Sequence, residues 1–101
     1  MRIYDQLRRA VADKRAIRCV FKGRLCDVCP HVVGHKNGQE MVLAFQYAGY
    51  SSTGLLPAGE WICMLVSDIS EVVDMGGTWR TGTSRSRPQT CIETIDLEVA
   101  S

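Results

Sequence analysis

Residues 17–47 read IRCVFKGRLCDVCPHVVGHKNGQEMVLAFQY and decide the fold. Apolar and polar residues alternate through much of this stretch, which is the period of a half-buried β-strand. Two breaks divide it: Lys22-Gly23, which is typical of a turn, and Asn37-Gly38, the strongest short hairpin signal in the chain. The stretch therefore predicts three strands joined by tight turns. They cover residues 17–22, 25–33 and 40–47.

The residues before this stretch predict one helix, over residues 1–14. Ile3, Leu7 and Val11 recur at intervals of four, which places them on one helix face. Most other positions are charged, so the helix has a single apolar stripe. We expect that stripe to pack on the strands.

After residue 47 the alternation of apolar and polar residues is less regular. Residues 48–59 hold three glycines, two serines and a proline, and this composition predicts a loop. Residues 78–90 are polar and basic and predict a flexible loop. We expect three further elements. They are a strand over 60–67, either a short turn with a strand or a last helical turn over 68–74, and a C-terminal strand over 91–100.

Length and composition fit one small soluble domain over residues 1–101. A helix followed by short strands, within residues 17–75 and 91–100, predicts a mainly β fold built as a strongly bent sheet or barrel. The net charge is only +1, but the charges are distributed unevenly along the chain, because residues 1–24 hold eight lysines and arginines and only two acids. Such a basic end fits contact with phosphates or with an acidic partner, and equally a solvated helix face.

The five cysteines include one C-x-x-C pair, Cys26 and Cys29. On a strand these two side chains point to opposite faces, so they cannot share a metal ion. Residues 1–20 are broken by charges, and neither an export signal nor a membrane segment is expected. We therefore expect no metal, no cofactor, and five reduced thiols in a cytoplasmic protein, with a cysteine-based metal or redox protein as the less favoured alternative.

Alternation along the second strand sorts its residues into two faces. The inward set is expected to be apolar. It consists of Cys26, Val28, Pro30 and Val32. The other face carries Asp27, Cys29 and His31, and predicts a surface histidine beside a half-exposed thiol.

Three stretches resemble the WYL domain: LRRAVADKRAIRCVFKGR, DVCPHVVGHKNGQEMVLAFQ and WICMLVSDISEVV. Phe21-Lys22-Gly23 matches the family's aromatic-x-Gly turn. Met41-Val42-Leu43 stands where the Trp-Tyr-Leu signature would be, so only the leucine is kept. Two further matches are Val28-Cys29-Pro30 to the Val-x-Pro strand and Asp68-Ile69 to the closing turn. Cys26 and Ile62 occupy positions that are often arginine in the family.

This resemblance, over about residues 7–74, implies a small SH3-like (Sm-like) β-barrel with an N-terminal helix. It also implies a non-enzymatic regulatory module that senses a nucleotide or a short single-stranded nucleic acid. We expect no catalytic residue. The expected ligand contacts are Arg24, His31, Gln46, Tyr47, Ser51, Ser52 and Arg80. The alternative is a protein-interaction subunit that forms a homo-oligomer or joins a larger assembly without a small ligand.

Overall fold

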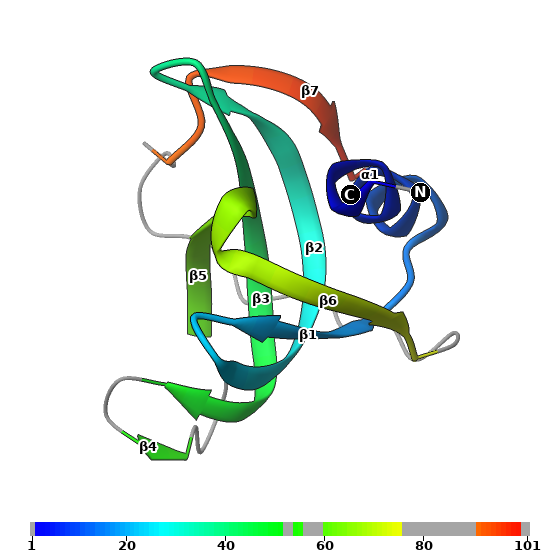
Figure 1. Cartoon of the computed structure of the whole chain (residues 1–101). Coiled ribbons are helices and arrows are strands. Elements are labelled where there is room, and N and C mark those ends of the chain that lie inside the picture. Colours follow the sequence, from blue (N-terminus) through cyan, green and yellow to red (C-terminus); the bar gives the residue numbers. More distant parts are fainter. Residues whose placement is uncertain (1, 52–53, 56–59, 76–90, 100–101) are drawn as a thin grey trace.

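The computed structural model describes residues 2–51, 54–55, 60–75 and 91–99, the side chains of 47–51, 54–55 and 60 excepted. These residues form one short helix and an antiparallel sheet, which confirms the mainly β prediction (Figure 1). The elements are α1 (Ile3–Asp13), β1 (Ile17–Phe21), β2 (Arg24–Lys36), β3 (Gln39–Ser51), β4 (Gly54–Leu55), β5 (Glu60–Leu65), the 3-10 turn η1 (Val66–Asp68), β6 (Ile69–Asp74) and β7 (Thr94–Glu98).

Two tight hairpins build the centre of the sheet, as the sequence predicts. Lys22 and Gly23 have φ angles of 51° and 80°, and Asn37 and Gly38 have φ angles of 53° and 77°. Two consecutive residues with positive φ make the turn that matches the twist of the flanking strands. The register follows directly, with Phe21 opposite Arg24 and Lys36 opposite Gln39.

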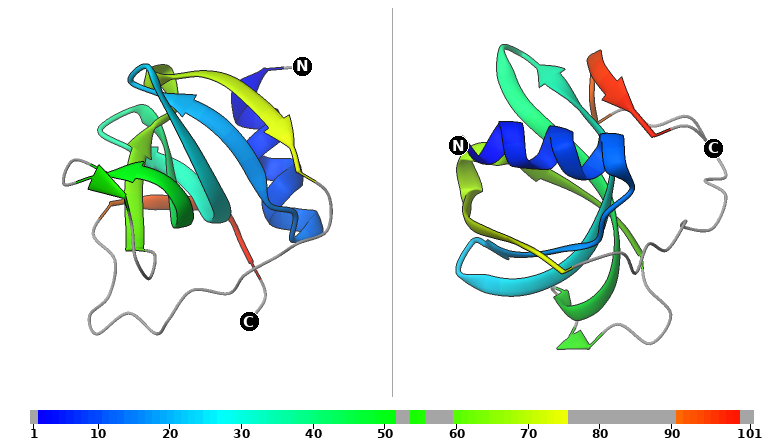
Figure 2. Two further views of the ribbon diagram at one scale, coloured as in Figure 1. Left: turned by 90° about the horizontal axis from the view of Figure 1, so that it is seen from below. Right: turned by 90° about the vertical axis from the view of Figure 1, so that its right-hand side faces the viewer.

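The central strands β2 and β3 are longer than predicted and curve strongly (Figures 1 and 2). β3 extends to Ser51 and pairs there with β4, so the predicted loop over 48–59 is wrong for these backbone segments. The sheet runs β5-β3-β2-β1-β6, and β7 pairs with the part of β2 that β1 leaves uncovered. The predicted flexible loop over 78–90 lies outside the described residues.

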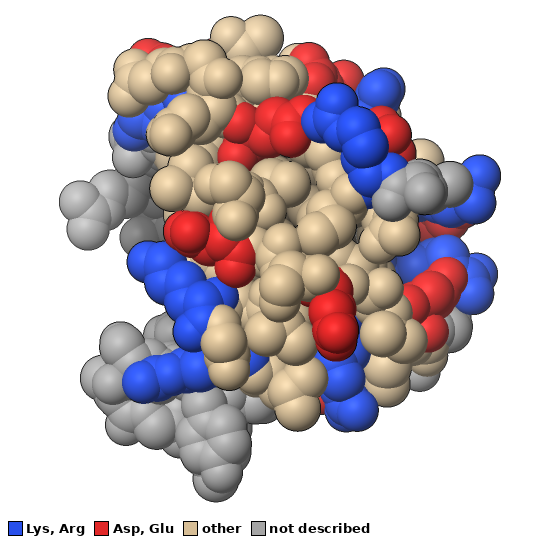
Figure 3. All heavy atoms as spheres, in the orientation of Figure 1, with Lys and Arg blue, Asp and Glu red and all other residues tan. Residues whose placement is uncertain are grey.

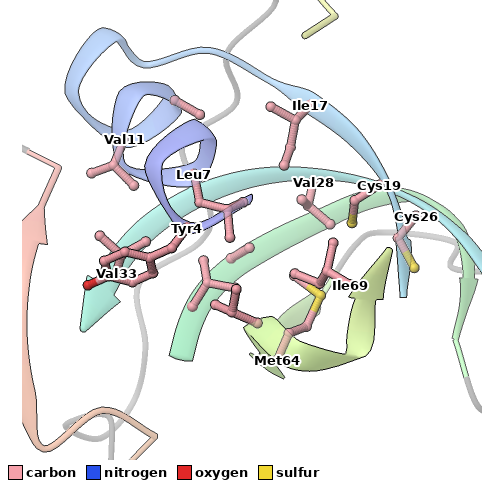
Figure 4. Close-up of a cluster of buried hydrophobic side chains, with 14 residues drawn as sticks. Tyr4, Leu7, Val11, Ile17, Cys19, Cys26, Val28, Val33, Met64 and Ile69 are labelled. Atoms are coloured by element: carbon pink, nitrogen blue, oxygen red, sulfur yellow. The ribbon is translucent and has the colours of Figure 1, made fainter. Parts of the chain in front are cut away.

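The helix packs one face against this sheet and closes the main core, as its apolar stripe predicts (Figure 4). Tyr4, Leu7, Ala10 and Val11 are buried, and Leu7 is fully so. Their partners come from six strands and η1, which include residues far apart in the chain. Buried strand partners include Ile17, Cys19, Cys26, Val28, Val33, Val42, Ala44, Met64 and Ile69.

A bulge in β2 changes the predicted assignment of faces. The register against β3 shifts between Pro30 and Val32, so the alternation restarts one residue later. Cys26 and Val28 lie in the main core as predicted. Val32 instead packs in a second cluster with Met41, Leu43 and Ile92, so its predicted place in the inward set is wrong.

β7 packs closely on β2 and is tied to the rest of the fold at several points. A Cβ atom at Gly34 would lie 2.0 Å from the carbonyl oxygen of Thr94, so only glycine permits this approach. The Tyr4 hydroxyl donates a hydrogen bond to Asp96, and burial together with this carboxylate raises the pKa of Tyr4. A Cys63–Cys91 disulfide joins β5 to the residues that lead into β7.

The fold brings the basic N-terminal residues together with acids from later in the chain. Arg18 donates two hydrogen bonds to Asp27, at 2.7 and 3.2 Å, and Arg2 forms an ion pair with Glu40. Lys/Arg and Asp/Glu side chains consequently lie interspersed over the face drawn in Figure 3. Within the described residues, no helix is long and apolar enough to cross a membrane.

Candidate ligand site

Of the residues predicted to bind ligand, the three whose side chains the structure describes do not share a pocket. Arg24 is exposed at the first position of β2, whereas His31 is buried in the middle of the same strand. Seven residues of strand separate them by roughly 20 Å. Gln46 is fully buried on β3, opposite Val28 of the main core. The side chains of Tyr47 and Ser51, and Ser52 and Arg80 altogether, lie outside the described residues.

His31 is a packing residue, which corrects its prediction as a surface histidine. Its relative exposure is 5%, and its Nδ1 lies 2.7 Å from the carbonyl oxygen of Cys29. Its ring meets the Trp61 ring edge-on at a centroid distance of 4.7 Å, and Trp61 in turn packs on Phe45 at 5.5 Å. Since Gln46 belongs to the opposite face of β3 from Phe45, His31 and Gln46 do not line a common cavity.

The cysteines divide into a disulfide pair and three buried thiols. Cys26 and Cys29 point to opposite faces of β2, as predicted, and no group of three or more metal-ligating side chains occurs among the described residues. The prediction of five reduced thiols is wrong, because Cys63 and Cys91 are bonded. Cys29 is fully buried rather than half-exposed.

We expect the three free thiols to resist alkylation in the folded protein. Burial, with smaller contributions from Cys26 and Asp27, raises the pKa of Cys19 to about 12. The attacking species is the thiolate, so at pH 8 only about one Cys19 in ten thousand is reactive. Mass spectrometry after N-ethylmaleimide treatment should find Cys19, Cys26 and Cys29 unmodified in native protein and modified in urea. Equal labelling in both conditions would show that these thiols are accessible.

One cavity among the described residues is lined by an arginine, Arg9, that has no ion-pair partner among them. It has a volume of about 230 Å³ and lies between α1 and the β1–β6 edge of the sheet. Its charged lining consists of Arg9, Arg15 and Asp74. The uncharged lining residues are Gln6, Ala10, Ile17 and Val72.

The local fold explains how the two arginines come to face this cavity. α1 ends at Asp13, and the left-handed conformation of the next residue, Lys14 (φ 53°), turns the chain back toward the sheet. The Arg15 N–H donates to the Ala10 carbonyl at 2.9 Å, so Arg15 stays beside the last helical turns. Arg9 lies one helical turn and a half earlier and reaches the same cavity from α1.

The acid of the cavity is placed by the β1–β6 pairing. Asp74 is opposite Ile17 in the sheet, and the next residue, Met75, donates its N–H to the Ala16 carbonyl at 3.0 Å. Asp74 Oδ2 accepts a hydrogen bond from Arg15 Nε at 2.6 Å. No described residue forms an ion pair with Arg9. The described residues that line the cavity therefore carry a net formal charge of +1.

Arg9 and Arg15 belong to the basic N-terminal segment, but neither residue is among the predicted ligand contacts. The available signal was their position near the end of a helix with one apolar face. The position of Asp74 beside them depends on a pairing between strands more than fifty residues apart, which local patterns do not reveal.

Comparisons with known proteins add no assignment to this site. No family model matches the chain, and no curated protein or solved structure matches it. The resemblance to WYL domains therefore stays a prediction based on the quoted motifs.

Proposed function

We propose that the chain is a non-enzymatic binding module for a small anionic ligand, with the cavity between α1 and β6 as its site. The observation that carries this proposal is the Arg9 guanidinium, which faces the cavity without an ion-pair partner among the described residues. Arg15 adds a second guanidinium to the same wall. Planar guanidinium groups are the side chains best suited to bind phosphate and carboxylate oxygens.

The fold that we propose for this module is a WYL-like, SH3-like barrel. Its support is the strand order β5-β3-β2-β1-β6, with a 3-10 turn between the two outermost strands. The curvature of β2 and β3 brings the β5 and β6 sides of the sheet toward each other around the main core (Figure 2).

A nucleotide or the end of a single-stranded nucleic acid remains the ligand class that we favour. Ordinary ligand pockets measure roughly 300–1,000 Å³, so a cavity of about 230 Å³ is too small to enclose a whole nucleotide. It has room for a phosphate and part of a sugar, with the base outside. Ala10, Ile17 and Val72 offer the apolar wall that a sugar needs.

The substitution R9Q is expected to weaken nucleotide binding by at least about tenfold, because it removes a charge-assisted hydrogen bond to phosphate. Calorimetric titration with mononucleotides and short oligonucleotides at low salt measures the effect. R8Q is the matched control, since Arg8 is exposed on the same helix and does not line the cavity. If no nucleotide or oligonucleotide binds the unmodified protein at low salt, the proposal fails.

The predicted cytoplasmic location stays a prediction, and the disulfide bears on it. A Cys63–Cys91 bond persists in oxidising compartments and is reduced in the cytoplasm of most organisms. Acid-quenched cell extracts, alkylated before and after reduction, would give the oxidised fraction of this pair. A fully reduced pair in cells supports the cytoplasmic location, and a fully oxidised pair contradicts it.

A protein-interaction subunit is the second candidate, and one surface favours it. Leu25 and Val73 are 57% and 53% exposed. Val20, on the outward face of β1, is opposite Leu25, and Val73 is opposite Arg18 on the same face. Exposed apolar side chains that adjoin one another are typical of contact surfaces. Light scattering over a range of concentrations decides between the candidates, since a constant monomer mass contradicts self-association.

A further inference from the structure

β7 is held on the outside of the fold, beside α1 (Figure 1). None of its residues, Thr94–Glu98, is buried, and Leu97 alone is partly so. In the described segment 91–99 only Ile92 is buried, in the second cluster. A strand that buries so little side-chain area adds little hydrophobic stabilisation, so it can detach locally at a lower free-energy cost than unfolding of the domain.

The Cys63–Cys91 disulfide is the covalent tie that keeps this segment on the sheet of its own chain. Cys63 lies on β5 and Cys91 shortly before β7, so the bond fixes the start of the segment whether or not β7 is paired with β2. Cys63 is exposed, so a small thiol reductant can reach its sulfur. A dithiol gives two electrons and two protons to the bond and closes into a disulfide itself. Both cysteines are then thiols, and the tie is gone.

β2 presents an edge that fits β7 in particular. Gly34 admits the Thr94 carbonyl oxygen, which lies 2.0 Å from the place where a Cβ atom would be. The register between the two strands shifts just before Gly34, so a partner strand needs a matching irregularity. On β7, Asp96 accepts a hydrogen bond from Tyr4 and lies 3.5 Å from His35 Nδ1. Because these features depend on the sequence of β7, the strand best fitted to a vacated β2 edge is the β7 of a second copy of this chain.

The chain that leads to this segment is long enough for exchange between copies. Residues 75–90 join β6 to residue 91, and a chain of that length spans at most roughly 55 Å. The largest extent of the fold is 33 Å. A detached segment can therefore reach β2 of a neighbouring copy while the rest of its own domain stays folded.

We propose that reduction of the Cys63–Cys91 disulfide allows two copies of the chain to exchange residues 91–99, so that each β7 pairs with the β2 of the other copy. Reoxidation then fixes whichever arrangement is present. The bond forms within one chain in the monomer and between two chains in the exchanged dimer. This inference goes beyond the proposed ligand site and does not depend on it.

Protein concentration decides between the two arrangements, because the exchanged dimer repeats the contacts of the monomer. A strand tethered to its own sheet is present there at an effective concentration on the order of 1 mM. We therefore expect exchange in about half of the reduced chains at about 1 mM protein, and in about one chain in fifty at about 10 µM.

An equal mixture of unlabelled and nitrogen-15-labelled protein tests the proposal without any substitution. The mixture is reduced with dithiothreitol, kept overnight, and reoxidised with glutathione disulfide, which is itself reduced to two thiols. Mass spectrometry then counts the Cys63–Cys91 peptide pairs that join a labelled chain to an unlabelled one. Such pairs should make up about a quarter of the total at about 1 mM protein and be at least about tenfold rarer at about 10 µM. A mixture that was never reduced should contain none.

The variants C63S and C91S distinguish strand exchange from random collision of exposed thiols. Neither variant can form the bond within one chain, but an exchanged pair brings Cys91 of the first beside Cys63 of the second. Collision in an equal mixture gives this mixed bond about twice as often as either same-residue bond, whereas exchange should favour it by at least about tenfold. G34A in the chain that keeps Cys63 should return the ratio to the collision value. G38A in that chain is the matched control and should leave the ratio unchanged, because nothing lies within 4 Å of its added methyl group.

Two results would overturn this inference. One is the presence of same-chain bonds alone at about 1 mM protein, or of mixed bonds only at the collision ratio. The other is the appearance of labelled–unlabelled pairs without reduction, since the disulfide would then not control exchange. Self-association through the surface that carries Leu25 and Val73 gives a different result, because it needs no reduction and does not link Cys63 to Cys91.

Discussion

Reduction of the Cys63–Cys91 disulfide is expected to lower the free energy of unfolding by about 3–4 kcal/mol. The bond joins residues 28 positions apart, and breaking it frees the unfolded chain to adopt many more conformations. The enclosed segment includes β6, which forms one wall of the candidate cavity. Urea unfolding of the same protein with and without a phosphine reductant measures the difference.

The double variant C63S/C91S provides the control for this experiment. It should unfold at the midpoint of the reduced protein and should no longer respond to the reductant. Cys19, Cys26 and Cys29 form no disulfide in the structure, so the reductant has no other bond to break. Identical midpoints for oxidised and reduced protein would contradict the expectation.

The substitution G34A is expected to cost about 3 kcal/mol, at the upper end of the range for overpacking. The added methyl group would lie 2.0 Å from the Thr94 carbonyl oxygen and 2.6 Å from Ile92 Cγ2. The first of these atoms belongs to the backbone, so no side-chain rotation relieves the contact. Either β7 moves away from β2 or the whole domain loses stability.

Hydrogen exchange distinguishes these two results. The Glu93 and Val99 amides donate to the carbonyls of His35 and His31, and both should exchange faster if β7 detaches. G38A is the control, because nothing lies within 4 Å of its added methyl group and only the positive φ is unfavourable, at about 1 kcal/mol. Equal destabilisation by the two variants would contradict a tight contact at Gly34.

Features that depend on neighbouring residues could be predicted from the sequence. Lys22-Gly23 and Asn37-Gly38 each set a turn by themselves, and the turns then fix the register of β1, β2 and β3. The helix could also be predicted from the sequence, because Leu7 and Val11 lie on one of its faces whatever they pack against.

Features that depend on distant partners could not be predicted in this way. The bulge after Pro30 exists only in relation to β3, and it moved Val32 to the second cluster. Five cysteines allow many pairings, so nothing local distinguished Cys63 and Cys91 from the rest. The candidate cavity was missed for the same reason, because Asp74 reaches Arg15 only through the pairing of β1 with β6.

The pairing of β7 with β2 has a consequence for how the chain acquires its structure during synthesis. Val33 is opposite Leu97, so one edge of a central strand has no partner until more than sixty further residues have been translated. Contacts between such distant residues form slowly, and an uncovered strand edge can meanwhile pair with another chain. The nascent protein therefore passes through a period in which β2 is open to misassociation, and arrival of β7 ends it.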